Sequence, residues 1–160
     1  MIHINILCIG KIKETYLKDA ISEYSKRLNK YCSLNITELP DEKISNNASE
    51  KDLFLIKEKE CKNIINLLKK DSYIICLDLK GKQYTSEEFS KKIENISLNG
   101  NSSITFIIGG SLGISQDLLN KSNELISFSK MTFPHQLFRV FLLEQIYRSF
   151  KIINNETYHK

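Results

Sequence analysis

The stretch FIIGGSLG, residues 106–113, decides the fold class of this 160-residue chain. Its apolar residues run straight into glycines, which is typical of a buried strand that ends in a tight turn. About fifteen residues later a second run, ISFSKMTFPHQ, residues 126–136, does the same. Two such turns on neighbouring strands favour a pocket built from backbone, and two plain chain reversals without a ligand are the alternative.

Apolar runs and amphipathic segments alternate along the chain on both sides of this stretch. We expect strands over residues 2–9, 33–40, 73–79, 103–110 and 125–129, and helices over residues 14–31, 49–70, 116–121 and 135–153. Thr85 and Glu88 have the spacing of a capping box and predict a further helix ahead of Phe89. This alternation predicts an α/β fold with a mostly parallel sheet flanked by helices, in a single domain over residues 1–160.

Composition and charge help to decide which classes of protein this sequence can belong to. The net charge of +4 is compatible with a polyanionic partner but does not indicate one. The four cysteines lie far apart, without C-x-x-C pairs or histidines at ligand spacing, so we expect no metal site and no disulfide framework. No run reaches the roughly 20 apolar residues of a membrane span, and the first residues read as a strand and not a signal peptide. We therefore expect a cytoplasmic protein.

The last helix predicts a partner chain. Its apolar residues from Leu137 to Ile153 spread almost all round the helix axis, which indicates burial on more than one side. A sheet covers one face only, so a second copy of the chain in a symmetric homodimer would cover the other. A central helix inside a monomer is the alternative.

Three turns leave carboxyl ends of expected strands, where open α/β sheets bind ligands. They are residues 78–82, 108–113 and 127–135. The glycines match neither the dinucleotide fingerprint nor the P-loop, which speaks against an oxidoreductase or a triphosphate site. Gly109 and Gly110 let the backbone approach a ligand closely, and nearby apolar residues suit a flat, uncharged ring such as adenine. Leu77, Met131, Thr132 and Phe133 would offer such a ring apolar contacts and carbonyl groups.

Two histidines stand out. His135 follows Pro134 at the start of the last helix, where the helix dipole disfavours its protonated form, although a packing role is the simpler interpretation. His159 lies one residue from the end of the sequence, where it has a function only if another surface captures it.

Several motifs together resemble one family. They are residues 127–152, SFSKMTFPHQLFRVFLLEQIYRSFKI, with IIGGSLG at 107–113, LDLKGK at 77–82, the first strand and the final YHK. On these residues the chain resembles, over essentially its whole length, the RlmH family of ribosomal RNA large-subunit methyltransferases, which belongs to the SPOUT class. Asn155 and Thr157 depart from the residues more usual in that family, which bears on the stiffness of the tail.

The resemblance implies a fold and an activity. The fold is an α/β knot, in which the C-terminal part of the sheet is threaded into a trefoil that holds S-adenosylmethionine, and the enzyme works as a homodimer. The activity is methylation of N3 of a pseudouridine in 23S rRNA of the assembled ribosome, without a metal. The cofactor-binding positions carried over are Leu77, Gly109, Phe128, Ser129, Lys130, Met131, Thr132 and Phe133.

We further expect a composite catalytic site. His159, with Tyr158 and Lys160, would fold over the pocket of the partner subunit. Arg139 or Arg148 would contact RNA phosphate, and His135 is a third candidate for binding the substrate. Glu144 and Arg148 are four residues apart, so a simple helix ion pair is the alternative for Arg148. A non-catalytic RNA-binding module is the alternative for the whole protein.

Overall fold

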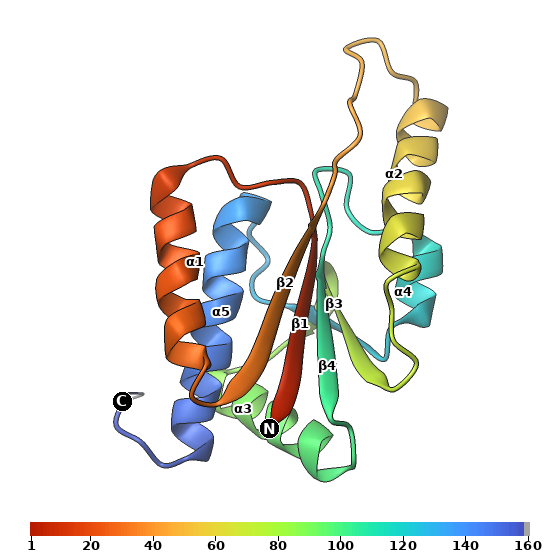
Figure 1. Cartoon of the computed structure of the whole chain (residues 1–160). Coiled ribbons are helices and arrows are strands. Elements are labelled where there is room, and N and C mark those ends of the chain that lie inside the picture. The colour runs from red at the N-terminus through yellow and green to blue at the C-terminus, as the bar shows by residue number, and fades with distance from the viewer. Residues whose placement is uncertain (159–160) are drawn as a thin grey trace.

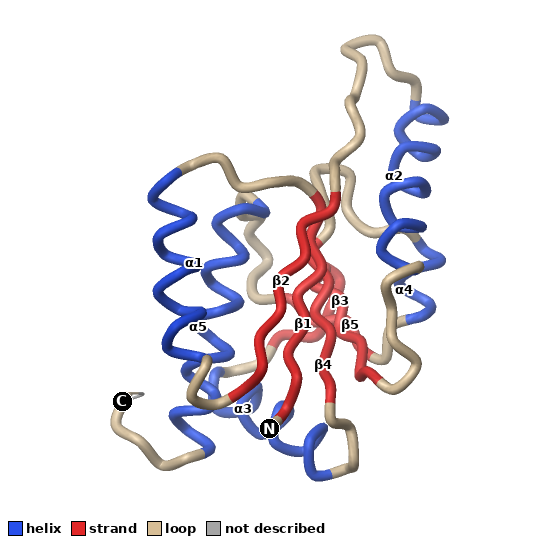
Figure 2. The backbone as a smooth tube through the Cα atoms, in the orientation of Figure 1, coloured by secondary structure: helices blue, strands red, loops and turns tan. Residues whose placement is uncertain are grey.

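The computed structural model describes residues 1–158 and contains one five-stranded sheet with helices on both faces, as Figures 1 and 2 show. The strands are β1 (Ile2–Ile9), β2 (Cys32–Leu39), β3 (Ser72–Gln83), β4 (Ser103–Ile108) and β5 (Glu124–Ser127). The helices are α1 (Thr15–Leu28), α2 (Glu50–Ile65), α3 (Ser86–Leu98), α4 (Gln116–Lys121) and α5 (His135–Ile153). The predicted α/β fold is confirmed.

All strand pairs are parallel, in the order β2-β1-β4-β3-β5. The central strands are buried on both faces, which explains their near-continuous apolar runs. On β1, Ile4 and Ile6 pack under α1, α3 and α5, while Leu7 and Ile9 pack under α2 and α4. The trefoil knot that the resemblance implies stays a prediction.

The third strand differs from the expectation. It was expected to end at residue 79 and to be followed by a turn at 78–82, but it continues to Gln83. Leu77 and Lys82 both pair with Ile126, so residues 78–81 bulge out of the ladder. Gly81 makes this possible, because a Cβ there would lie 2.5 Å from the carbonyl carbon of Ile126.

The helix starts were predicted better than the helix ends. Ser49 and Thr85 cap α2 and α3 in capping boxes with Asp52 and Glu88. Helix α2 ends at Ile65, not near residue 70, because the N–H groups of Leu67 and Leu68 bond to carbonyl oxygens three residues back and not four. Helix α5 has the predicted bounds.

Helix α5 lies on the sheet between α1 and α3 (Figure 1), which cover part of its apolar circumference within one protomer. Leu142, Leu143 and Ile146 are fully buried, whereas Phe141 on the outer side remains 36% exposed. The wide apolar surface of α5 is therefore partly explained without a second copy of the chain.

No helix within residues 1–158 is both long and apolar enough to cross a membrane. The same residues contain no cluster of histidine, cysteine and carboxylate side chains that could hold a metal ion. The four cysteines are all buried and free, and burial raises the pKa of the Cys8 thiol to about 11.

Candidate functional site

A cavity of about 380 Å³ opens at the carboxyl ends of β3, β4 and β5. We call it the edge cavity. Its walls come from residues 77–80, 108–114 and 126–133, with His135 and Phe138 from the start of α5. The volume is in the usual range for a small-molecule site.

The edge cavity brings together seven of the eight predicted cofactor-binding residues: Leu77, Gly109, Phe128, Ser129, Met131, Thr132 and Phe133. The eighth, Lys130, belongs to the same segment, but its side chain is exposed and does not line the cavity. The three predicted turns thus meet at one place, although the first of them is a bulge within β3.

The turn after β4 is built from bare backbone. A Cβ on Gly109 would lie 2.9 Å from the carbonyl oxygen of Gly113, so a side chain there needs the backbone to move. Gly110 pairs with Gly113 in an isolated bridge, and Gly113 has a φ of +81°, which favours glycine. Gly109 therefore serves a close approach of backbone to backbone within the turn. The close approach of this backbone to a ligand, which the sequence predicted, stays a prediction.

The segment after β5 is held by its own side chains. The Ser127 hydroxyl donates to the carbonyl oxygen of Ser129 at 2.9 Å, and the Ser129 hydroxyl accepts the N–H of Met131 at 3.0 Å. The Phe128 ring packs 4.8 Å from Phe138 between ring centroids. These contacts fix the wall of the edge cavity, while the side chain of Met131 is 73% exposed.

His135 lies in the wall between the edge cavity and a smaller cavity of about 220 Å³ that Asp41, Glu42 and Glu60 also line. Burial and then the charge of Arg139 lower the pKa of His135, and Asp41 opposes them. The imidazole is therefore neutral near pH 7, which agrees with the effect expected from the helix terminus.

Arg139 lies in the interior. Its side chain is 2% exposed, pairs with Glu38 at 2.7 Å and donates to the carbonyl oxygens of Ile9 and Gly10. A contact of Arg139 with RNA phosphate would need an exposed guanidinium, which this arrangement does not offer. Instead, Arg139 ties the first turns of α5 to the carboxyl ends of β1 and β2.

A second cavity, of about 330 Å³, lies between α3, β5 and α5. We call it the α3–α5 cavity. It shares five wall residues with the edge cavity, namely Ile126, Ser127, Phe128, Ser129 and Phe133. Its other walls come from Tyr84, Thr85, Ser86, Phe89, Phe141, Glu144 and Gln145.

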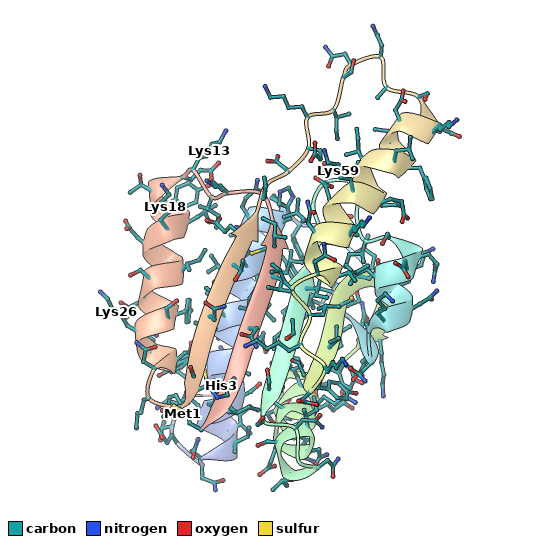
Figure 3. All side chains as sticks on the ribbon, turned by 45° about the vertical axis from the view of Figure 1, so that its right-hand side comes forward. Met1, His3, Lys13, Lys18, Lys26 and Lys59 are labelled. Atoms are coloured by element: carbon teal, nitrogen blue, oxygen red, sulfur yellow. The ribbon has the colours of Figure 1, made fainter. Side chains whose placement is uncertain are left out.

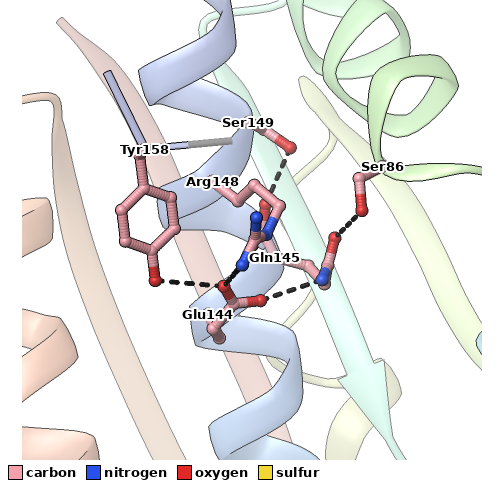
Figure 4. A network of polar contacts seen from close by, with 6 residues as sticks. All are labelled: Ser86, Glu144, Gln145, Arg148, Ser149 and Tyr158. Carbon is pink, nitrogen blue, oxygen red and sulfur yellow. Dashed lines mark hydrogen bonds and ion pairs between the residues drawn. The ribbon is translucent and has the colours of Figure 1, made fainter. Parts of the chain in front are cut away.

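A polar network on α5 joins this cavity to the tail, as Figure 4 shows. Arg148 pairs with Glu144 at 2.6 Å, which confirms the helix ion pair. The Tyr158 hydroxyl donates to Glu144 at 3.2 Å, and the guanidinium of Arg148 lies over the Tyr158 ring at 4.7 Å. Burial and the nearby Glu144 raise the pKa of Tyr158 to about 12, so its hydroxyl stays a donor. His159 and Lys160 lie outside the described residues.

Sequence reasoning missed Glu156, which holds the root of the tail. Its carboxylate accepts hydrogen bonds from Lys151, Lys30 and, at 2.8 Å, the hydroxyl of Tyr31. The bond from Lys151 and then that from Tyr31 lower the pKa of Glu156 to about 2. Two of these partners are about 125 residues away in the sequence, so no local pattern could have revealed the contact.

Comparison with known proteins places this geometry in a family. The family model described as "Predicted SPOUT methyltransferase" matches residues 2–159. The chain is 59% identical to ribosomal RNA large subunit methyltransferase H 1 of Clostridium perfringens (strain SM101 / Type A) and 60% identical to ribosomal RNA large subunit methyltransferase H of Clostridium botulinum (strain Eklund 17B / Type B). Each match spans 158 residues and 99% of both proteins.

A solved structure shows the same fold at low sequence similarity. It is that of a probable methylase family protein from Haemophilus influenzae Rd KW20, with a TM-score of 0.54 and 12% identity over 98% of this chain and 70% of that one. The full-length matches carry the assignment. The chain belongs to the SPOUT methyltransferase family and, within it, to the group of the ribosomal RNA large subunit methyltransferases H.

Proposed function

We propose that this methyltransferase transfers a methyl group from S-adenosylmethionine to N3 of a pseudouridine in the 23S rRNA of the assembled ribosome. The group to which the chain belongs supports an rRNA substrate. The observation that carries the proposal is the edge cavity, in which three distant segments bring seven of the eight expected cofactor-binding residues together.

The residues of the edge cavity fit an adenosyl group. Its walls are mostly apolar or bare backbone, with Leu77, Phe128 and Phe138 for contact with a flat ring and glycine carbonyl and N–H groups at its edge. When bound, S-adenosylmethionine supplies a methyl group whose bond to sulfur breaks as a bond to N3 forms, releasing S-adenosylhomocysteine and the N3 proton. The work left to the chain is alignment of the two reactants and acceptance of that proton.

We infer that the tail completes the site on a second copy of the chain. In the structure Tyr158 contacts Glu144 of its own chain, and it would leave this contact when the tail reaches the partner. His159 and Lys160 follow directly and would bind or activate the base. The apolar circumference of α5, which α1 and α3 cover only in part, supports a symmetric homodimer in which each tail reaches the other protomer.

Deleting Tyr158, His159 and Lys160 tests the role of the tail. We expect methylation of ribosomes to be lost and the affinity for S-adenosylmethionine, measured by calorimetry, to stay within about twofold, because Tyr158 is not among the described residues that line the edge cavity. A deletion that leaves Tyr158 in place separates the two terminal residues from the tail anchor. Full activity of the shorter chain would contradict the proposal.

Mixing experiments test the second copy. A tail-deleted protomer and a protomer with a blocked edge cavity are each expected to be inactive, while a refolded mixture recovers part of the activity if the tail acts on the partner. A mixture as inactive as its components would show that each tail serves its own protomer.

The RNA surface is expected to be spread over the dimer. Lys18 and Lys26 project from α1 and Lys13 from the loop before it, as Figure 3 shows, and a second copy would double this patch. The modest net charge of +4 favours recognition of the shape of the ribosome over a single basic groove. Such a substrate places the protein in the cytoplasm. Mass spectrometry of 23S rRNA from cells with and without the gene identifies the methylated nucleotide.

A further inference from the structure

We propose that the α3–α5 cavity receives the acceptor base, and that Glu144 selects pseudouridine over uridine by accepting a hydrogen bond from N1–H. This inference rests on the proposed function. A methyl transfer requires the acceptor to lie against the donor. The α3–α5 cavity meets that need, because it shares the wall of Phe128, Ser129 and Phe133 with the edge cavity.

The lining of the α3–α5 cavity suits a pyrimidine ring. Four phenylalanines form its apolar part, with Phe133 and Phe141 edge to face at 5.4 Å and Phe89 and Phe128 edge to face at 6.0 Å. Aromatic walls give a base stacking contacts that do not depend on its identity. Identity must then be read by polar groups at the edge of the ring.

Three such polar side chains belong to the part of the lining that the two cavities do not share. Ser86, Glu144 and Gln145 line the α3–α5 cavity and not the edge cavity. The Ser86 hydroxyl donates to Gln145 Oε1 at 2.8 Å, and Gln145 Nε2 donates to Glu144 Oε2 at 2.8 Å. These hydrogen bonds, drawn in Figure 4, fix the Glu144 carboxylate, which lines the α3–α5 cavity.

The carboxylate has acceptor capacity left for a ligand. Arg148 and Tyr158 both bond to Oε1, whereas Oε2 accepts from Gln145 and has a second lone pair. The guanidinium of Arg148 balances the negative charge at 2.6 Å. An ionised carboxylate only accepts hydrogen bonds, so it favours a ring with an N–H at this position.

Pseudouridine and uridine differ at this one group. In pseudouridine the ring is joined to ribose through C5, so N1 carries a hydrogen, whereas in uridine N1 is bonded to ribose. The N3–H between two carbonyls is common to both. With N3 turned toward the shared wall, N1 of pseudouridine, on the other side of C2, faces the unshared part of the lining, to which Glu144 belongs. The reaction that supplies this substrate is therefore the isomerisation of uridine to pseudouridine.

The test compares ribosomes that carry pseudouridine or uridine at the target position, the latter from cells without the corresponding pseudouridine synthase. We expect the wild-type protein to prefer pseudouridine, in kcat/KM and in binding measured without S-adenosylmethionine. The variant Glu144→Gln should lower both preferences by roughly tenfold or more, as expected for loss of a hydrogen bond to a charged group. A thermal melt and calorimetry with S-adenosylmethionine check that this variant folds and keeps its edge cavity.

Tyr158→Phe is the matched control, since it removes a different hydrogen bond from the same carboxylate. Because Tyr158 anchors the tail, this variant should change the rate of methylation. The preference for pseudouridine should nevertheless stay within about twofold of wild type. A folded Glu144→Gln protein with an unchanged preference would overturn the inference, and so would a preference lost equally in both variants. If instead the wild-type protein methylates neither ribosome at N3, the proposed function itself fails.

Discussion

The edge cavity and the tail region of this methyltransferase are built from different materials. The edge cavity owes its form to backbone: a Cβ on Gly109 would lie 2.9 Å from the carbonyl oxygen of Gly113, and the bulge in β3 packs against Ile126. The tail region is held by side chains, through the ion pairs of Glu144 with Arg148 and of Glu156 with Lys151. Adding a side-chain atom should therefore disturb the edge cavity most, whereas removing a charge should destabilise the tail region most.

Gly81→Ala should have the largest effect and is the most direct test of the role of backbone in the edge cavity. Its Cβ would lie 2.5–2.7 Å from three backbone atoms of Ile126, which no side-chain movement relieves. We expect the free energy of unfolding to fall by about 3 kcal/mol, measured by urea denaturation, with loss of S-adenosylmethionine binding. A variant as stable as wild type would show that the β3 bulge is not constrained by the backbone.

Gly109→Ala and Gly110→Ala form a matched pair that separates a contact with backbone from a contact with a side chain within one turn. The first Cβ would meet the carbonyl oxygen of Gly113 at 2.9 Å, whereas the second would meet a methyl group of Ile9 at 3.0 Å. Because backbone yields less than a side chain, we expect Gly109→Ala to weaken S-adenosylmethionine binding tenfold or more, about 1.4 kcal/mol. Gly110→Ala should weaken it less. The reverse order in calorimetry would contradict a backbone-built wall.

Glu156→Gln tests the side-chain region and should have the smallest effect. The pKa of Glu156 is lowered from 4.5 to about 2 in the folded protein, so its contribution is present above pH 4.5 and is lost as the pH falls toward 2. We expect the difference in unfolding free energy between wild type and variant to shrink over this window, and to shrink with added salt at neutral pH. The variant Tyr31→Phe, which keeps both ion pairs, should retain most of the pH dependence. A difference independent of pH would exclude an electrostatic role for Glu156.

The sequence predicted the order and type of every helix and strand, because apolar periodicity and capping residues such as Ser49 and Thr85 are local signals. The errors were at ends that depend on tertiary contacts. The β3 strand runs past residue 79 because it pairs with β5 on both sides of a bulge, and nothing in residues 78–82 alone indicates that pairing. Strand order was likewise beyond local patterns.

The site divided in the same way. The place of the edge cavity was predicted from the sequence, because apolar strands that run directly into glycine-rich turns are a local signal. The interior position of Arg139, the contacts of Glu156 and the α3–α5 cavity depend on side chains that meet across the fold. Charge type alone did not distinguish the buried Arg139 from Arg148, whose side chain is 25% exposed.

The burial of all four cysteines makes the molecule convenient for spectroscopy. None of the native thiols reaches solvent, and burial raises the pKa of Cys32 and Cys76 to about 12, so maleimide reagents have little thiolate to attack. A cysteine introduced at the exposed Thr157 would be the most accessible thiol. A fluorophore attached there could report the movement of the tail during turnover without removing any native residue of the core.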